Sequence, residues 1–414
     1  MLKEKMLSDL EFFLDKLERV HVLSVNGFSE KQKIIIEKVE ERIELGLSEN
    51  EFLFALNEIA CSFNDAHTKV EIANLKQKVL DIGIRWIDGD VYIVDDSDDF
   101  KCGDKIISIG GKNKDELMKM LRNVIAAEND YWLSDHIYVF RLERYLKHFN
   151  MLDENDFVEI TILREDKKLT YNSQVKEKVD SYRDEGEYKF VKYSIDKSRS
   201  LAILELESCI YNDKYISMVK EMFEKVKEEN IGNILIDLRE NMGGNSGVAT
   251  EFIKYLDVDE YKVDRVDKRV SNEVLEVFEW EKEIGYFKGD DIICENNKNE
   301  DLAFKGNIYI FTSNITFSSA TDFAVLFRDN NLAKIVGEPT GGKPSSLGDI
   351  MCFELPNCNV SFSVSWKLFH RPDDSKEDEL TLFPDVIIKK DIKHILSGKD
   401  IQLELFYKEL SREL

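Results

Sequence analysis

Proline, cysteine and long apolar runs are all scarce in this chain of 414 residues. The six cysteines form no CxxC pair, and no histidine pattern completes a metal site, so we expect reduced thiols rather than a disulfide framework. We expect neither a metal nor an organic cofactor. The five prolines all fall in the last quarter of the chain, where loops are therefore shaped more sharply, at positions 339, 344, 356, 372 and 384.

Basic residues are also in deficit, and no apolar stretch approaches the length of a membrane span. There are 57 Lys and Arg against 82 Asp and Glu, which gives a net charge of −25. This balance argues against nucleic acid and anionic membrane surfaces as partners. The first 20 residues are amphipathic and charged throughout, without the apolar centre of a signal peptide. We therefore predict a soluble cytoplasmic protein, whose 43 % hydrophobic residues suffice for sizeable cores.

The chain divides into regions of different periodicity. Amphipathic helical patterns cover 3–20, 29–45 and 48–61, the last opened by a capping box of Ser48 and Glu51. Short alternating runs and aromatic-rich helical stretches follow, and Asp180–Glu187 is polar enough to be a linker. We predict an N-terminal helical region (1–67), a β-rich and helical middle region (68–180), a catalytic core (185–395) and a C-terminal helix (396–414).

The core region alternates strands with helices. The expected strands are Ala202–Leu206, Ile234–Leu238, Ile308–Phe311 and Lys334–Val336. The expected helices lie between them, at about 212–229, 246–256 and 320–329. This alternation predicts parallel βαβ units and an α/β fold.

A serine lies at the turn between one such strand and the next helix. In Phe311–Ala320 an apolar run ends in polar residues that include Ser318. A turn of this kind projects a hydroxyl, and the N–H of Ser319 at the start of the helix points towards the same place. Ser318 is therefore a candidate nucleophile, although a serine here is more often only a helix N-cap.

Two glycines occupy the matching place after another strand. Gly243 and Gly244 end the stretch Asn233–Gly244. Glycine lets the backbone approach a substrate carbonyl and present an N–H without a Cβ in the way. Together with Ser319 they are candidate oxyanion-hole donors, each such donor being worth about 2.7–4 kcal/mol in the transition state. A plain turn explains the pair equally well on its own.

A nucleophilic serine needs a base, and two candidates are available. Lys343 lies in a Gly- and Pro-rich loop after the next expected strand, but its pKa would have to fall from about 10.4 to about 7–8. His67, in the segment Asn64–Thr68, needs no such shift. Sequence separation does not choose between them, and either residue could instead be an ordinary surface lysine or helix-end histidine.

These motifs together resemble those of the C-terminal processing (tail-specific) serine protease family, which includes tricorn-like and chlamydial-type members. Ile236–Gly244 resembles the family's D-L-R-x-N-x-G-G loop, Thr316–Ala324 its nucleophile segment, and Val336–Lys343 its V-G-E-P-T-x-G-K segment. The resemblance covers about 188–390. It implies an α/β fold with a crotonase/ClpP-like ββα-type protease core.

The resemblance leaves two branches of the family open. Lys343 follows Ser318 by 25 residues (343 − 318), the spacing of the Ser–Lys dyad in the tail-specific branch. That branch also has a PDZ domain before the core, and Gly83–Trp86 and Gly103–Gly111 resemble parts of one. The middle region is therefore expected to be PDZ-like.

Asp65–Thr68 instead resembles the D-G-H-T segment of the tricorn-like branch, which uses a Ser–His–Glu triad. That branch implies a late glutamate as the residue that orients the histidine, and Glu377 and Glu379 both precede Pro384–Asp385 here. We favour His67 as the base because this set needs no tuned pKa, while Lys343 stays the alternative.

The sequence thus predicts a serine peptidase that hydrolyses peptides or unfolded or tagged proteins through an acyl-enzyme on Ser318. A homo-oligomer is compatible with this prediction. The strand expected at Val360–Trp366 favours extended peptide substrates, which proteases hold as an added strand. The alternatives are a catalytically silent protein on the same scaffold that binds peptides or apolar ligands, and a thioester or lipid hydrolase.

Overall fold

The computed structural model describes residues 1–75, 77–177, 190–279 and 283–413. The linker expected at Asp180–Glu187 lies outside the described residues. Within them, no helix combines the length and the apolar character needed to cross a membrane. The predicted mixed α/β fold is confirmed.

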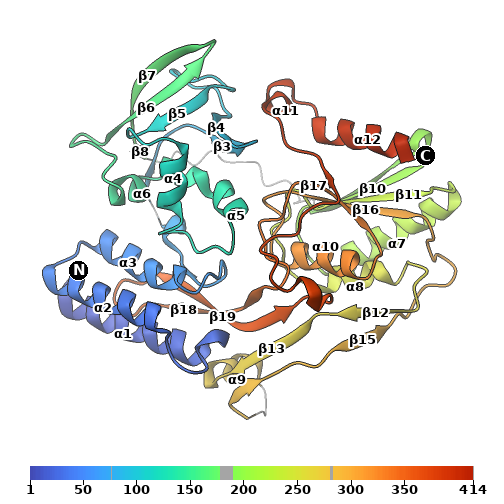
Figure 1. The fold of residues 1–414 in the computed structure, drawn as a ribbon, viewed down its shortest axis with the longest axis horizontal. Coiled ribbons are helices and arrows are strands. Elements are labelled where there is room, and N and C mark those ends of the chain that lie inside the picture. Colours follow the sequence, from blue (N-terminus) through green and yellow to red (C-terminus); the bar gives the residue numbers. More distant parts are fainter. Residues whose placement is uncertain (76, 178–189, 280–282, 414) are drawn as a thin grey trace.

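Three N-terminal helices form one corner of the molecule (Figure 1). They are α1 (Lys3–Val20), α2 (Glu30–Leu45) and α3 (Glu49–Cys61). The predicted capping box is confirmed, since the Ser48 side chain accepts the N–H of Glu51 and the Glu51 carboxylate accepts that of Ser48. α1 buries one apolar face, including Leu10, Phe13 and Leu17, as its 3.6-residue spacing requires.

A five-stranded antiparallel sheet with short helices forms the middle region. Its strand order is β3–β4–β5–β6–β7. The strands are β3 (Ile84–Ile87), β4 (Asp90–Ile93), β5 (Lys105–Ile109), β6 (Phe157–Arg164) and β7 (Lys167–Gln174). The helices are α4 (Lys114–Leu121), α5 (Asp130–Asp135) and α6 (Glu143–His148), and a two-stranded ribbon joins β2 (Lys78–Val79) to β8 (Lys176–Glu177).

A six-stranded sheet forms the centre of the α/β region, in the order β20–β17–β16–β11–β10–β9. Its strands are β9 (Val191–Asp196), β10 (Leu201–Leu206), β11 (Asn233–Asp237), β16 (Asn307–Thr312), β17 (Lys334–Gly337) and β20 (Val386–Ile387). All neighbours are parallel except β9 and β10, so the predicted parallel units are confirmed. The helices are α7 (Asp213–Glu228), α8 (Gly247–Ile253) and α10 (Ser319–Asp329).

The register of β11 against β16 decides where the two predicted loops lie. Asp237 pairs with Phe311, and β11 and β16 are parallel. The loops that follow these strands therefore leave the sheet side by side at one edge. The Gly243 turn and Ser318 thus lie together because their strands are adjacent.

A second sheet connects the two halves of the molecule. β19 (Ser361–His370) pairs with β18 (Leu347–Glu354) along one edge, while β1 (Lys69–Val70) and β13 (Arg265–Val270) share the other. β14 (Gly285–Phe287) extends this sheet beyond β13. The prediction that Val360–Trp366 offers an edge to substrate is wrong, because both edges of β19 are occupied by the protein itself.

The remaining elements lie at the rim. β12 (Glu260–Val263) pairs with β15 (Ile292–Glu295), and α9 (Asn272–Phe278) follows β13. The helical end of the chain is two helices rather than the single one predicted, α11 (Ile392–Ser397) and α12 (Ile401–Glu413). Gly398 ends α11 in the left-handed conformation, with φ of 64°, which interrupts the helix.

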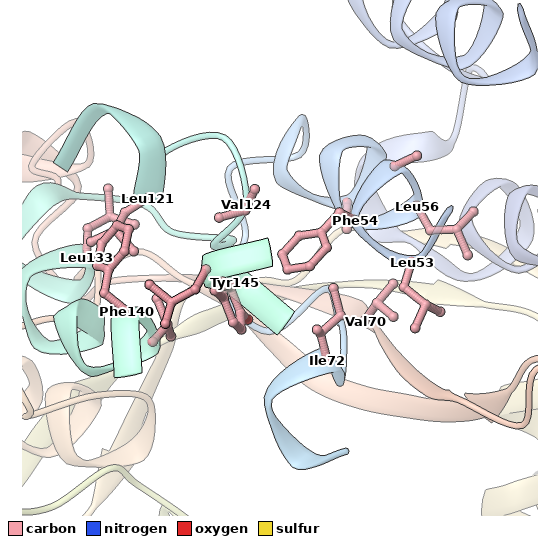
Figure 2. Packing of buried hydrophobic residues seen from close by; sticks show 14 of the residues in the cluster. Leu53, Phe54, Leu56, Val70, Ile72, Leu121, Val124, Leu133, Phe140 and Tyr145 are labelled. Atoms are coloured by element: carbon pink, nitrogen blue, oxygen red, sulfur yellow. The ribbon is translucent and has the colours of Figure 1, made fainter. Parts of the chain in front are cut away.

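One hydrophobic cluster joins the N-terminal helices to the middle region. Phe54 of α3 meets Tyr145 of α6 edge to face at 5.0 Å, next to Val70 (Figure 2). Phe362 and Trp366 of β19 belong to the same cluster. β19 therefore packs with the N-terminal half, although it lies in the sequence region predicted as the core.

Candidate active site

Ser318 has a strained backbone. It is the residue before α10, with φ of 52° and ψ of −133°. Positive φ is uncommon for a residue other than glycine and costs about 1–3 kcal/mol, and such strain concentrates at functional sites. In α/β-hydrolases a strained strand-to-helix turn of this kind exposes the nucleophilic serine.

Gly243 lies directly against this turn. Its φ is 101°, and a Cβ added to it would lie 2.7 Å from the Ser318 Cβ and 2.9 Å from the Ser319 nitrogen. No other residue type fits here without moving the nucleophile. The Gly243 N–H donates to Asn241 Oδ1 at 2.8 Å, so it is already engaged.

Of the three predicted oxyanion donors, Gly243 has its N–H engaged in the structure. Gly243 supplies the close approach but not a free N–H. For the N–H groups of Gly244 and Ser319, the described part of the chain provides no acceptor, and the Ser319 hydroxyl donates to the Gly244 carbonyl at 2.9 Å. That bond fixes the two donors relative to each other.

His67 meets Ser318 although 251 residues separate them. Its Nε2 lies 3.1 Å from the Ser318 Oγ, within hydrogen-bonding distance. The imidazole stacks on Phe317 at 4.6 Å between centroids, and Phe317 stacks on Trp132 at 3.9 Å. The imidazole is thereby held by Ser318 and by two stacked aromatic side chains, Phe317 beside the serine and Trp132 of the middle region.

Strand pairing brings His67 to this position. β1 follows the histidine directly, and Lys69 lies opposite Ser363 of β19. The Ser363 hydroxyl donates to the His67 carbonyl at 2.6 Å, and the His67 N–H donates to Asp65 Oδ1 at 2.9 Å. Two residues of strand therefore suffice to fix the histidine, because side chains on each side of it bind its backbone.

Asp65 is fully buried beside the histidine. Its Oδ2 accepts from His21 Nε2 at 3.3 Å and from the Thr68 hydroxyl at 2.5 Å. Burial alone would raise the pKa of Asp65, but the hydrogen bond from His21 and the nearby His67 imidazole outweigh it and hold the pKa well below its usual range. Asp65 is therefore a fixed anion in this site.

Glu128 is a second carboxylate beside the histidine, and no sequence motif indicated it. It lies between α4 and α5, and its Oε1 accepts the N–H of Ala66 at 3.2 Å. Burial raises the pKa of Glu128 to about 7, and the charge of Asp65 adds to the rise. Only the packing of the middle region against 65–67 reveals this residue.

Glu377 and Glu379, the predicted orienting residues, bind other partners. Glu377 accepts from the Ser345 hydroxyl at 2.7 Å and lies 2.6 Å from His370 Nδ1. Glu379 accepts from Arg371 at 2.6 Å. Neither makes a hydrogen bond to His67 in the described part of the chain, because the segment that carries them packs against the end of β19 instead.

Lys343 is close to the site but does not bond to the nucleophile. It follows Gly342, where an added Cβ would lie 3.2 Å from the Ser318 nitrogen. Among the described residues, no ion pair or hydrogen bond involves its side chain, whereas Ser318 Oγ is met by His67. The geometry therefore favours the histidine of the two predicted bases.

One group of side chains has the composition of a metal site. A ligand-type atom from each of Asp65, His67 and Glu128 lies within 4.8 Å of the other two, and no other such group occurs in the described ranges. Both Asp65 oxygens already accept hydrogen bonds, so the residue is poorly available as a metal ligand.

Known proteins resemble this chain in sequence over part of its length and in fold over nearly all of it. Two structures of mature CPAF, one of them complexed with lactacystin, superpose with TM-scores of 0.72 at 14% and 13% identity. The alignment covers 98% and 99% of this chain and 97% and 98% of theirs. No curated protein matches the sequence significantly.

At such identities the superposition establishes the fold, and the sequence match carries the family. Residues 200–388 match the profile of peptidase family S41. They include the Gly243 turn, Ser318 and Lys343, whereas His67 lies outside them. Over these residues the chain matches peptidase family S41, which confirms its resemblance to this family of serine-type peptidases.

Proposed function

We propose that Ser318 is the nucleophile and His67 the general base of this serine peptidase. One observation carries the proposal: a strained serine at a strand-to-helix turn has its Oγ 3.1 Å from His67 Nε2. A base within 2.6–3.2 Å of the hydroxyl is what activation of a serine requires.

The steps follow from these positions. His67 Nε2 takes the hydroxyl proton as Ser318 Oγ attacks the carbonyl carbon of a peptide bond. The N–H groups of Gly244 and Ser319 hold the oxyanion. His67 returns the proton to the leaving amine, and a water molecule, deprotonated by the same nitrogen, then hydrolyses the acyl-enzyme.

Lys343 has a different part in this proposal. Its side chain, which has no partner among the described residues, lies in the loop beside Ser318. As a cation it would contact a negatively charged group of the substrate, for example a carboxylate of a peptide. Peptides and unfolded or tagged proteins remain the substrates we propose, and action in the cytoplasm and an oligomeric form remain predictions.

We also propose a crotonase/ClpP-like core and a PDZ-like middle region. The parallel order β17–β16–β11–β10, with α10 following β16, supports the first assignment. The five-stranded antiparallel sheet with α4 and α5 supports the second. The four regions of the chain, with boundaries at 67, 180 and 395, stay a proposal.

Labelling with a fluorophosphonate tests the nucleophile. The wild type should be labelled at Ser318, and Ser318→Ala should not be labelled while keeping its circular dichroism spectrum. Ser8→Ala, which changes an exposed serine of α1, serves as a matched variant that should still be labelled. A folded wild type that resists the probe would contradict the proposal and favour the silent binding protein.

A further inference from the structure

Two buried polar atoms beside the proposed base lack partners. In the described part of the chain, neither His67 Nδ1 nor Glu128 Oε2 has a hydrogen-bond partner, and both atoms are sealed from solvent. A buried polar group left unsatisfied costs about 1–3 kcal/mol. Two such atoms at one site call for a common explanation.

The two side chains are within reach of each other. A ring nitrogen of His67 and carboxylate oxygens of Asp65 and Glu128 lie within 4.8 Å of one another. Because 4.8 Å is the upper limit of these distances, an N–O contact near 2.9 Å needs a shift of no more than about 2 Å. Hydrogen bonds at catalytic sites are often long without substrate and shorten when it binds.

Asp65 is the competing carboxylate, and its oxygens are already taken. Its Oδ1 lies 3.7 Å from His67 Nδ1, beyond a hydrogen bond, and accepts the backbone N–H of His67 instead. Its Oδ2 accepts from His21 and Thr68. Glu128 uses only Oε1, for the N–H of Ala66, and keeps Oε2 free.

We propose that Glu128 positions His67 by accepting its Nδ1–H through Oε2. This inference rests on the proposed role of His67 as base. The bond fixes the tautomer that leaves Nε2 unprotonated to face Ser318, and it stabilises the imidazolium that forms when Nε2 takes the serine proton. Glu128 thereby does the work that the sequence assigned to Glu377 or Glu379.

The placement of Glu128 is itself controlled. The next residue, Asn129, caps α5 by accepting the N–H of Trp132, and its Nδ2 donates to the carbonyls of Gly341 and Leu380 at 2.9 and 2.8 Å. Trp132 then supports Phe317 under the imidazole. The start of α5 thus ties the glutamate, the base and the nucleophile loop into one unit.

The proton on Glu128 controls this role. The charged groups that act on its carboxyl are Asp65, which raises its pKa, and His67, which lowers it, and the balance with burial puts the pKa at about 7. A protonated Glu128 carboxyl is a weaker acceptor for the His67 Nδ1–H. Without its negative charge it also no longer stabilises the imidazolium. We expect the rate of labelling to fall as the pH drops through about 7, because a proton on Glu128 weakens the acceptor for the His67 Nδ1–H.

Glu128→Gln tests the inference. Glutamine keeps the acceptor for Ala66 but turns an N–H towards His67 Nδ1, which favours the wrong tautomer; a comparable change in a serine protease triad costs about 10⁴-fold. We expect a loss of about 10³-fold or more in labelling rate, partial rescue by Glu128→Asp, and a shallower acid limb of the pH profile, because glutamine does not titrate. Glu154→Gln, an exposed carboxylate on the same region, should leave both rate and slope unchanged.

The stability of Glu128→Gln relative to wild type should rise with pH even though its labelling rate is low. This distinguishes the loss of a positioning role from misfolding. The pKa of Glu128 is raised above its ordinary value of 4.5, so the folded wild type loses stability as pH rises from about 4.5 to about 7. Glutamine does not titrate. The melting temperature of Glu128→Gln relative to wild type should therefore increase across this range, even as labelling is lost.

The outcomes distinguish the two proposals. If the wild type is labelled and Glu128→Gln reacts equally fast with an unchanged pH slope, the positioning role is overturned while Ser318 stays the nucleophile. If the wild type is not labelled, proton NMR of protein with ¹⁵N-histidine tests the contact between His67 and Glu128 without relying on activity. A strongly deshielded His67 Nδ1–H that Glu128→Gln removes supports the contact, and its absence from the wild type overturns it.

Discussion

The two halves of the proposed site are built by different means. The nucleophile half, Ser318 with the Gly243 turn, comes from two adjacent parallel strands, and its geometry is fixed by backbone conformation. The base half, His67 with Asp65 and Glu128, comes from the first third of the chain and is fixed by side chains. One half is a property of a local fold, and the other depends on long-range packing.

This difference explains why only one half falls within the family match. The motifs around Gly243 and Ser318 both lie within the matched residues 200–388. The base half carries a shorter motif, the four residues Asp65–Thr68, which lie outside the matched range. The base half should therefore depend on remote residues that the nucleophile half does not need.

The largest effect should come from replacing the two candidate bases by alanine, one at a time. We expect His67→Ala to reduce peptide hydrolysis by about 10⁴-fold or more, since a serine without its base is nearly inert. Lys343→Ala should change kcat by less than about tenfold, a modest loss of substrate contact. Steady-state kinetics on a peptide substrate measures both, and the reverse ranking would place the base in the nucleophile half.

A steric change should break the nucleophile half without touching the base. Gly243→Ala puts a methyl group 2.7 Å from the Ser318 Cβ, so we expect a loss of about 10²-fold or more in kcat. Gly46→Ala is the matched control: its φ of 98° is close to the 101° of Gly243, but nothing lies within 4 Å. If both variants lose the same activity, backbone strain rather than contact with Ser318 is responsible.

The contrast between the halves also marks what the sequence could predict. The strands flanking Ser318 and Gly243 were predictable because apolar runs alternate with helical patterns, and parallel neighbours deliver their loops to one edge. His67 was recognisable by its motif. Glu128 was not, since a glutamate between two short helices carries no periodic signal, and its role depends on burial against Ala66.

Glu377 is the opposite case, a residue that the sequence singled out but that the structure places elsewhere. Its spacing from Ser318 suggested an orienting role, but the fold directs its carboxylate to His370 and Ser345. Distance along the chain does not specify which way a loop turns. The paired edges of β19 were hidden for the same reason, because a strand pattern does not reveal its neighbours.

A substitution in the distant helix α1 should destabilise the base half. Asp9 of α1 is fully buried and accepts from the backbone N–H groups of Asn357 and Cys358, at 2.9 and 3.1 Å, in the turn between β18 and β19. Asp9→Asn should lower the free energy of unfolding by about 1–3 kcal/mol, because one buried donor loses its acceptor. Urea unfolding measures this.

The exposed residue Glu11 provides the control on the same helix. Glu11→Gln should leave stability within about 0.5 kcal/mol of wild type, as is usual for surface substitutions. Labelling of Ser318 should slow in Asp9→Asn more than in Glu11→Gln if the hairpin supports the histidine. Equal rates would show that β19 holds His67 independently of α1.

The smallest effect should come from the aromatic support that the two halves share. Phe317 stacks between His67 and Trp132, and an aromatic pair contributes about 0.5–1.5 kcal/mol beyond the area it buries. Phe317→Leu should therefore slow labelling by about two- to tenfold, because the imidazole loses its fixed orientation. Phe327→Leu removes a stacked pair with Phe323 in the core, so it should lower stability while leaving the labelling rate nearly unchanged. A similar loss of rate in both variants would mean that general packing, rather than support of the imidazole, limits the reaction.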